Sequence, residues 1–124
     1  MNKKQKNVLG GDLELCSSNP LTGWHRDGCC NTDNNDYGLH TVCAKVNSNF
    51  LEWCKSAGND LITPHPEFGF PGLKDGDNWC VCASWFARAI EAGQDCKIYL
   101  KRTNEKTLKI VPLEVLKKYA IDLS

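Results

Sequence analysis

Residues 77–93 read DNWCVCASWFARAIEAG and carry a long periodic pattern. Apolar residues recur at the i, i+3, i+4, i+7, i+8 and i+11 spacing of a helix with one buried face: Trp79, Cys82, Ala83, Phe86, Ala87 and Ile90. Asp77 is a suitable N-cap, and Gly93 is a suitable C-terminal stop. We therefore predict a helix near residues 78–92, with Cys82 buried on its apolar face.

Two weaker patterns predict two more helices. Apolar residues recur with helical spacing after Asn47 and Ser48, either of which can cap a helix near residues 48–57. Pro112 suits the first position of a helix near residues 113–120. Alternating apolar residues on both sides of residues 104–105 predict a hairpin near 97–111. The expected class is α+β, with about three helices and a small, mostly antiparallel sheet.

The rest of the chain is poor in regular patterns. Gly, Asn, Asp, Ser and Pro dominate residues 10–40, so the N-terminal half is expected to be rich in loops. The segment 58–76 is broken by three prolines but carries aromatic rings. We expect a flexible basic tail at residues 1–6 and a single domain at 7–124, since 124 residues suit one core.

The charge balance indicates no polyanionic partner. Fifteen Lys and Arg residues match fifteen Asp and Glu residues, so nothing in the net charge attracts nucleic acid or an anionic membrane. The polar start lacks the apolar run of a signal peptide, and no stretch is long and apolar enough to span a bilayer. We therefore expect a soluble cytoplasmic protein with no nucleic-acid or membrane partner.

The chain has eight cysteines, which in a reducing cytosol seldom form disulfides. Metal binding, thiol chemistry and plain burial are then the main interpretations, and Cys54 on an apolar stripe is an example of burial. A disulfide is the remaining alternative. Cys29 and Cys30 are adjacent and cannot pair without strain, so any bridge would join distant cysteines.

Zinc is the metal that thiol and imidazole ligands favour. Our candidate ligands are Cys30, Cys43 and Cys80, which lie off the apolar stripes, His40, and Cys82, whose position is ambiguous. No Cys-x-x-Cys pair is present, so spacing alone supports the site weakly. In this interpretation the chain is a small cysteine-rich module with a zinc-binding, structural or interaction role.

The alternative is a thiol-dependent enzyme or redox factor. Cys80 would occupy the third position of the helix capped by Asp77, where the helix dipole favours a thiolate. Our candidate catalytic residues are therefore Cys80, Cys30 and His40, with the histidine as a base. Candidate binding residues are Arg26 and Asp27 near Cys30, and Glu67 and Phe70 in the Pro-Gly loop that would form a pocket wall.

Both interpretations require the cysteines to meet in space. We predict that the loop-rich half folds back, bringing Cys30 and Cys43 close to Cys80 or Cys82. Under the enzyme hypothesis, Cys80 should be partly exposed and more reactive than Cys54 or Cys82.

Several short motifs recur together along the chain. They include PLTG at 20–23, RDGCCNT at 26–32, HTVCA at 40–44, GNDL at 58–61, PEFGFPGL at 66–73, and GD followed by WCVCA at 76–83. As a set they resemble a family of small bacterial and plant proteins known only as a domain of unknown function. The resemblance covers nearly the whole chain and implies one intact domain, but it brings no activity, cofactor or catalytic residue.

Overall fold

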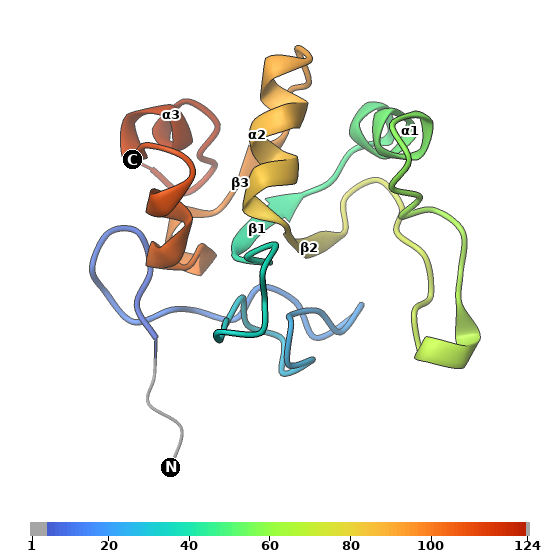
Figure 1. Ribbon diagram of the computed structural model, residues 1–124, viewed down its shortest axis with the longest axis horizontal. Helices are drawn as coiled ribbons and strands as arrows, with labels where there is room; N and C mark the ends of the chain where they lie inside the picture. The colour runs from blue at the N-terminus through green and yellow to red at the C-terminus, as the bar shows by residue number, and fades with distance from the viewer. Residues whose placement is uncertain (1–4, 124) are drawn as a thin grey trace.

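The computed structural model describes residues 5–123, and these form an α+β fold, as predicted (Figure 1). In chain order the elements are β1 (Val42–Lys45), α1 (Ser48–Ser56), the 3-10 helix η1 (Pro66–Phe68), β2 (Asn78–Val81), α2 (Ala83–Glu91), β3 (Lys97–Ile98), the 3-10 helices η2 (Leu100–Arg102) and η3 (Glu105–Lys109), and α3 (Leu113–Lys118). No helix within 5–123 is long and apolar enough to cross a membrane.

The sheet is antiparallel, with the strand order β2-β1-β3. Side chains alternate between the two faces of a strand, and this alternation divides the core. Val42 and Val81 are paired and join the large apolar cluster. Cys43 and Cys80, the next pair, join a separate cluster of four cysteines. In Figure 1 the helices lie along one side of the sheet and the N-terminal loops along the other.

The first and third helices are close to their predicted bounds. Asn47 caps α1 by accepting a hydrogen bond from the backbone N–H of Phe50 at 2.8 Å. Phe50 and Cys54 on this helix are buried, as the apolar stripe predicts. Pro112 precedes α3, which ends at Lys118, two residues before its predicted end.

The helix predicted at 78–92 begins later, because residues 78–81 form the strand β2. Trp79 fits the helical stripe, but Trp79 and Val81 also share one face of a strand, and pairing with β1 favours the extended form. Asp77 does not cap a helix; its carboxylate accepts the backbone N–H of Lys74 at 3.0 Å in a turn. Cys82 is the N-cap instead, so the prediction that Cys80 lies in the first turn of a helix is wrong.

The hairpin predicted at 97–111 is also wrong. The strand β3 is limited to Lys97–Ile98, which pair with β1, and the 3-10 helices η2 and η3 follow. The alternation of apolar residues is misleading here, because Leu108 and Ile110 are exposed while Thr107 is buried. Thr107 reaches a polar partner in the core, the hydroxyl of Thr41 at 2.7 Å.

The N-terminal half is rich in loops, as predicted, and covers the cysteine face of the sheet. Residues 1–4 of the predicted tail lie outside the described residues. Gln5 is attached to the loops, since its amide donates to the carbonyl of Thr32 at 2.8 Å. Lys6 forms a bridge with Asp12, and their side chains make an ion pair at 2.9 Å.

Candidate functional site

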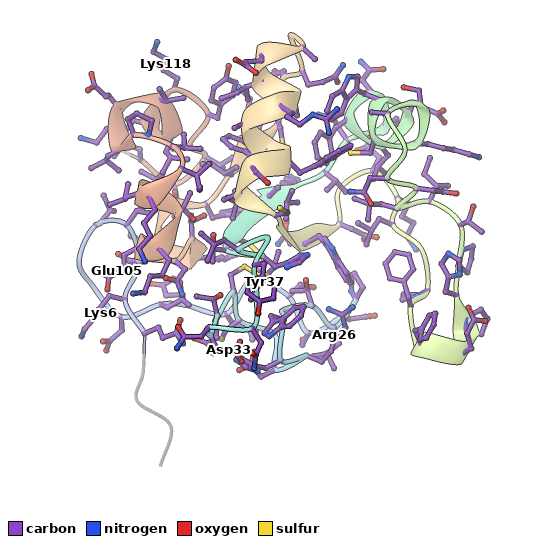
Figure 2. The ribbon with its side chains drawn as sticks, in the orientation of Figure 1. Lys6, Arg26, Asp33, Tyr37, Glu105 and Lys118 are labelled. Atoms are coloured by element: carbon purple, nitrogen blue, oxygen red, sulfur yellow. A yellow bond between two sulfur atoms is a disulfide. The ribbon has the colours of Figure 1, made fainter. Side chains whose placement is uncertain are left out.

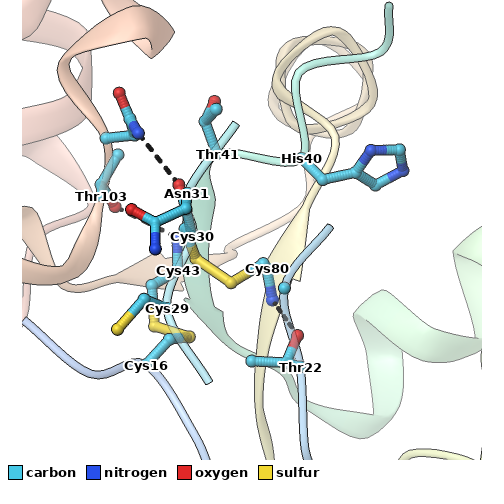
Figure 3. Close-up of a disulfide and its surroundings, with 12 residues drawn as sticks. Cys16, Thr22, Cys29, Cys30, Asn31, His40, Thr41, Cys43, Cys80 and Thr103 are labelled. Carbon is cyan, nitrogen blue, oxygen red and sulfur yellow. Dashed lines mark hydrogen bonds between the residues drawn. A yellow bond between two sulfur atoms is a disulfide. The ribbon is translucent and has the colours of Figure 1, made fainter. Parts of the chain in front are cut away.

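Four cysteines meet on the loop-covered face of the sheet, where they form two disulfides (Figure 3). Cys16 is bonded to Cys43 and Cys30 to Cys80, so each bridge joins a loop cysteine to a strand cysteine. The predicted convergence of Cys30, Cys43 and Cys80 is confirmed, with Cys16 as a further member. The disulfide alternative, with bridges between distant cysteines, is also confirmed.

The disulfides fasten both ends of the loop 17–29. Cys16 and Cys30 flank this loop, and their partners face each other across β1 and β2. Between the two ends, the hydroxyl of Thr22 accepts the backbone N–H of Cys80 at 2.9 Å. The two disulfides and this hydrogen bond therefore hold the loop against the sheet.

This arrangement corrects the premise of an exposed Cys80 thiolate. Cys80 is 2% exposed and Cys30 is 0% exposed, and each has its sulfur in a disulfide. Neither is a thiol that can attack a substrate until the disulfide is reduced.

The candidate zinc ligands divide into two groups. Within residues 5–123, one group of three or more potential ligand atoms lies close together: the sulfurs of Cys16, Cys30 and Cys80, within 4.8 Å of one another. Cys82 and His40 lie instead in a neighbouring pocket, and Figure 3 shows the His40 ring pointing away from the disulfides. The predicted five-residue set is thus not one ligand sphere.

The pocket has a volume of about 530 Å³ and lies beside the disulfide of Cys80. Three segments form it: the N-terminal loops, the loop 59–70, and the end of β2. Its lining residues are Gly23, Trp24, Arg26, His40, Asn59, Asp60, Leu61, His65, Phe68, Phe70, Trp79, Cys80, Val81 and Cys82. A cavity of this size and apolar character suits a small molecule.

Cys82 is the thiol of this pocket. It is free and half-buried at the start of α2, rather than buried on a helical stripe as predicted. Its Sγ donates to the carbonyl oxygen of Gly38 at 2.7 Å and lies 3.1 Å from the Ser84 hydroxyl. Cys82 follows the last residue of β2 and is the N-cap of α2, whose dipole favours negative charge at this end.

His40 is the imidazole of the pocket, and a buried carboxylate orients it. Its Nδ1 lies 2.6 Å from Asp36, whose side chain is fully buried. Asp36 also accepts the Thr32 hydroxyl and the backbone N–H of His40, both at 2.9 Å. Burial alone raises the pKa of Asp36, but the hydrogen bonds from His40 and Thr32 outweigh it and lower the net pKa.

Gly38 separates the thiol from the imidazole. A Cβ atom built on Gly38 would lie 3.1 Å from Cys82 Sγ and 3.5 Å from His40 Cε1. The two side chains therefore border the same small space, which the missing side chain keeps open. The Trp24 ring stacks on the His40 ring; the two ring centres are 5.6 Å apart and the rings are nearly parallel.

The candidate binding residues differ in their positions. Arg26 and Phe70 line the pocket, and both contact the Trp79 ring. The Cζ atom of Arg26 lies 5.1 Å from the centre of this ring, and the centre of the Phe70 ring lies 5.3 Å from it. Glu67 is exposed and bonds to His65, while Asp27 accepts bonds within its own loop. Phe70 of the Pro-Gly loop lines the cavity together with Phe68.

The other three cysteines outside the disulfides differ from Cys82 in burial or position. Burial raises the pKa of Cys54 and raises that of Cys96 to about 12, so both stay protonated at neutral pH. Cys29 is half-buried like Cys82 but does not line the pocket. The sequence analysis assigned no role to Asp36 and did not place Cys82 in the pocket. The available signal for Asp36 was its position four residues before His40.

The comparisons with known proteins give a family but no activity. No curated protein matches the chain. A family model described as an uncharacterized protein conserved in bacteria, DUF2237, matches residues 6–120 and so covers every element of the fold. The chain therefore belongs to the DUF2237 family.

Proposed function

We propose that the protein is a thiol-dependent enzyme in which Cys82 is the nucleophile, His40 the general base and Asp36 the group that orients His40. The observation that carries this proposal is the open space at Gly38, bordered by the Cys82 thiol and by an imidazole whose Nδ1 is held by a buried carboxylate. Cys80 and Cys30, the nucleophiles expected from the sequence, then serve as a structural disulfide.

The reaction class is attack on a small electrophilic ester or thioester. The Cys82 thiol gives its proton to His40 Nε2 and its sulfur bonds to the carbonyl carbon. The protonated imidazole then gives this proton to the leaving alcohol or thiol as its bond to the carbon breaks. Water, losing a proton to the same imidazole, hydrolyses the acyl thioester and regenerates the thiol. No oxidant or metal enters the balance.

The arrangement of the resting site is compatible with these roles. Cys82 donates to Gly38 rather than to His40, and catalytic hydrogen bonds often form only when substrate is present. Backbone N–H groups in the first turn of a helix have no partner inside that helix. At the start of α2 the N–H of Ala83 donates to the carbonyl of Leu39 at 2.8 Å, so those of Ser84 and Trp85 are the ones that can stabilise the oxyanion that forms next to Cys82.

The test is turnover of p-nitrophenyl esters and aryl thioesters by purified protein. We expect C82S and H40N to lower kcat/KM by about 10²-fold or more, the usual contribution of a nucleophile or base. C29S is the matched control, since it removes another half-buried thiol, and should leave the rate unchanged. Equal turnover by wild type and C82S would exclude this function.

A zinc module is a second candidate, favoured by the closeness of the Cys16, Cys30 and Cys80 sulfurs. Reduction of both disulfides would release four thiols, with Cys43 as the fourth, and tetrahedral thiolate sets are typical of structural zinc. Metal analysis with thiol counting on protein prepared under reducing conditions tests it. One zinc per chain with four protected thiols would support the module, and no zinc would remove it.

A further inference from the structure

We propose that the ligand of the pocket is a small carboxylate with an aromatic or planar apolar body, and that Arg26 binds the carboxylate. The substrates of the proposed thiol enzyme, on which the relevance to catalysis rests, are then esters or thioesters that also carry such a carboxylate. The binding itself depends on residues other than Cys82, so it can be measured separately.

Arg26 presents an uncompensated positive charge at the pocket. Its Nη1 donates to the carbonyl of Gly23 at 2.7 Å, leaving the other donors of a five-donor guanidinium for a ligand. Within residues 5–123, none of the ion pairs involves Arg26. A guanidinium matches the geometry of a carboxylate better than any other side chain does.

The local backbone holds this residue in place. Arg26 has a φ of 55°, a left-handed conformation that residues other than glycine seldom adopt. Its backbone N–H donates to Gly23 at 3.0 Å, and its guanidinium lies over the Trp79 ring. Figure 2 shows Arg26 on the N-terminal loops, on the side nearest the loop that carries η1. The side chain is thus set against the pocket wall before a ligand arrives.

The other walls suit a planar body. Trp79 and Phe70 meet edge to face at 5.3 Å, and Trp24 forms the opposite aromatic stack with His40. All four line the same cavity. Aromatic walls with one fixed charged group are typical of sites for small aryl compounds.

Asp60 is the negative group of the same cavity. Its carboxylate accepts the Thr63 hydroxyl at 2.6 Å and the backbone N–H groups of Ile62 and Thr63. The hydroxyl bond and these two others lower the pKa of Asp60 to about 2. Since these donors already satisfy the carboxylate, we assign the ligand-binding charge to Arg26 and not to Asp60.

The experiment uses three ligands with one phenyl body: phenylacetate, phenylacetamide and phenethylamine. Tryptophan fluorescence of the C82S protein, which cannot turn over a substrate through Cys82, reports binding at Trp24 and Trp79. We expect phenylacetate to bind about tenfold more tightly than phenylacetamide, in line with one charge-assisted contact. R26Q should remove this preference and R26K should keep part of it.

R88Q is the matched control, because Arg88 lies over the Trp85 ring at 4.6 Å but outside the pocket. It should leave the preference for phenylacetate unchanged. Equal binding of all three ligands, or preference for phenethylamine, would overturn the inference. Because the binding test depends on Arg26 and not on Cys82, such a result would leave the ester-turnover test of the proposed function standing. Conversely, an absence of ester turnover alone would leave this inference about Arg26 standing.

Discussion

At the scale of single residues, the account depends on the space between Cys82 and His40. The sequence could not place these residues together, because they lie 42 positions apart and Cys82 fits a buried helical stripe equally well. The His40 assignment could be made from residue type. The role of Asp36 could not, because its side chain is one of several Asx residues in a polar run.

Substitution of Gly38 by alanine tests this space. Gly38 does not have a positive φ, so alanine fits the backbone, but its methyl group would lie 3.1 Å from Cys82 Sγ. We expect iodoacetamide labelling of Cys82 to slow several-fold with little change in melting temperature. G11A is the control, as its methyl group meets Asn7 at an ordinary 3.4 Å. Unchanged labelling in G38A would show that the space is not used.

Substitution of Asp36 by asparagine tests the buried carboxylate. Because the folded pKa of Asp36 is below its ordinary 3.8, its contribution to stability is present above pH 3.8 and is lost as pH falls through the lower folded value. Asparagine cannot accept all three donors, so D36N should cost about 1–3 kcal/mol at pH 7 by urea unfolding. The difference from wild type should shrink below pH 3.8; a difference independent of pH would contradict the assignment.

At the scale of elements, local signals predicted α1 and α3, because each has a cap or proline start next to an apolar stripe. They failed at β2, where Trp79 fits both the helical stripe and a strand face shared with Val81, and only pairing with β1 decides between the two. They failed again at 97–111, where Leu100 and Thr107 are buried within 3-10 helices. Long-range contacts, which no local pattern records, set both segments.

The disulfide of Cys30 and Cys80 should stabilise the loop 17–29 on the sheet. Its removal in C30S/C80S should lower the free energy of unfolding by about 2–4 kcal/mol, the usual effect of a native disulfide. Hydrogen exchange should rise in this loop before it rises in α1. C29S, which leaves both disulfides intact, should change stability by less than about 0.5 kcal/mol. Equal exchange of loop and helix would contradict this order.

At the scale of the whole molecule, the sheet separates two environments. Its helix side carries the large apolar core, and its other side carries the four cysteines and the N-terminal loops, which form one wall of the pocket. The α+β fold class was predictable because it depends on the overall pattern of apolar and turn residues along the chain. The pairing of four cysteines was only an alternative, because the sequence argument began from a reducing cytosol, where disulfides seldom form. The two disulfides remove that premise, and the cytoplasmic localisation stays a prediction.

The most direct measurement is mass-spectrometric mapping of the acyl group after brief reaction with a p-nitrophenyl ester. The account predicts acylation of Cys82, at a rate that falls by about 10²-fold or more in H40N. Cys29 is the internal reference, and Cys54 and Cys96 should stay unmodified because they are buried. Acylation of Cys29 as fast as Cys82, or an unchanged Cys82 rate in H40N, would contradict the account.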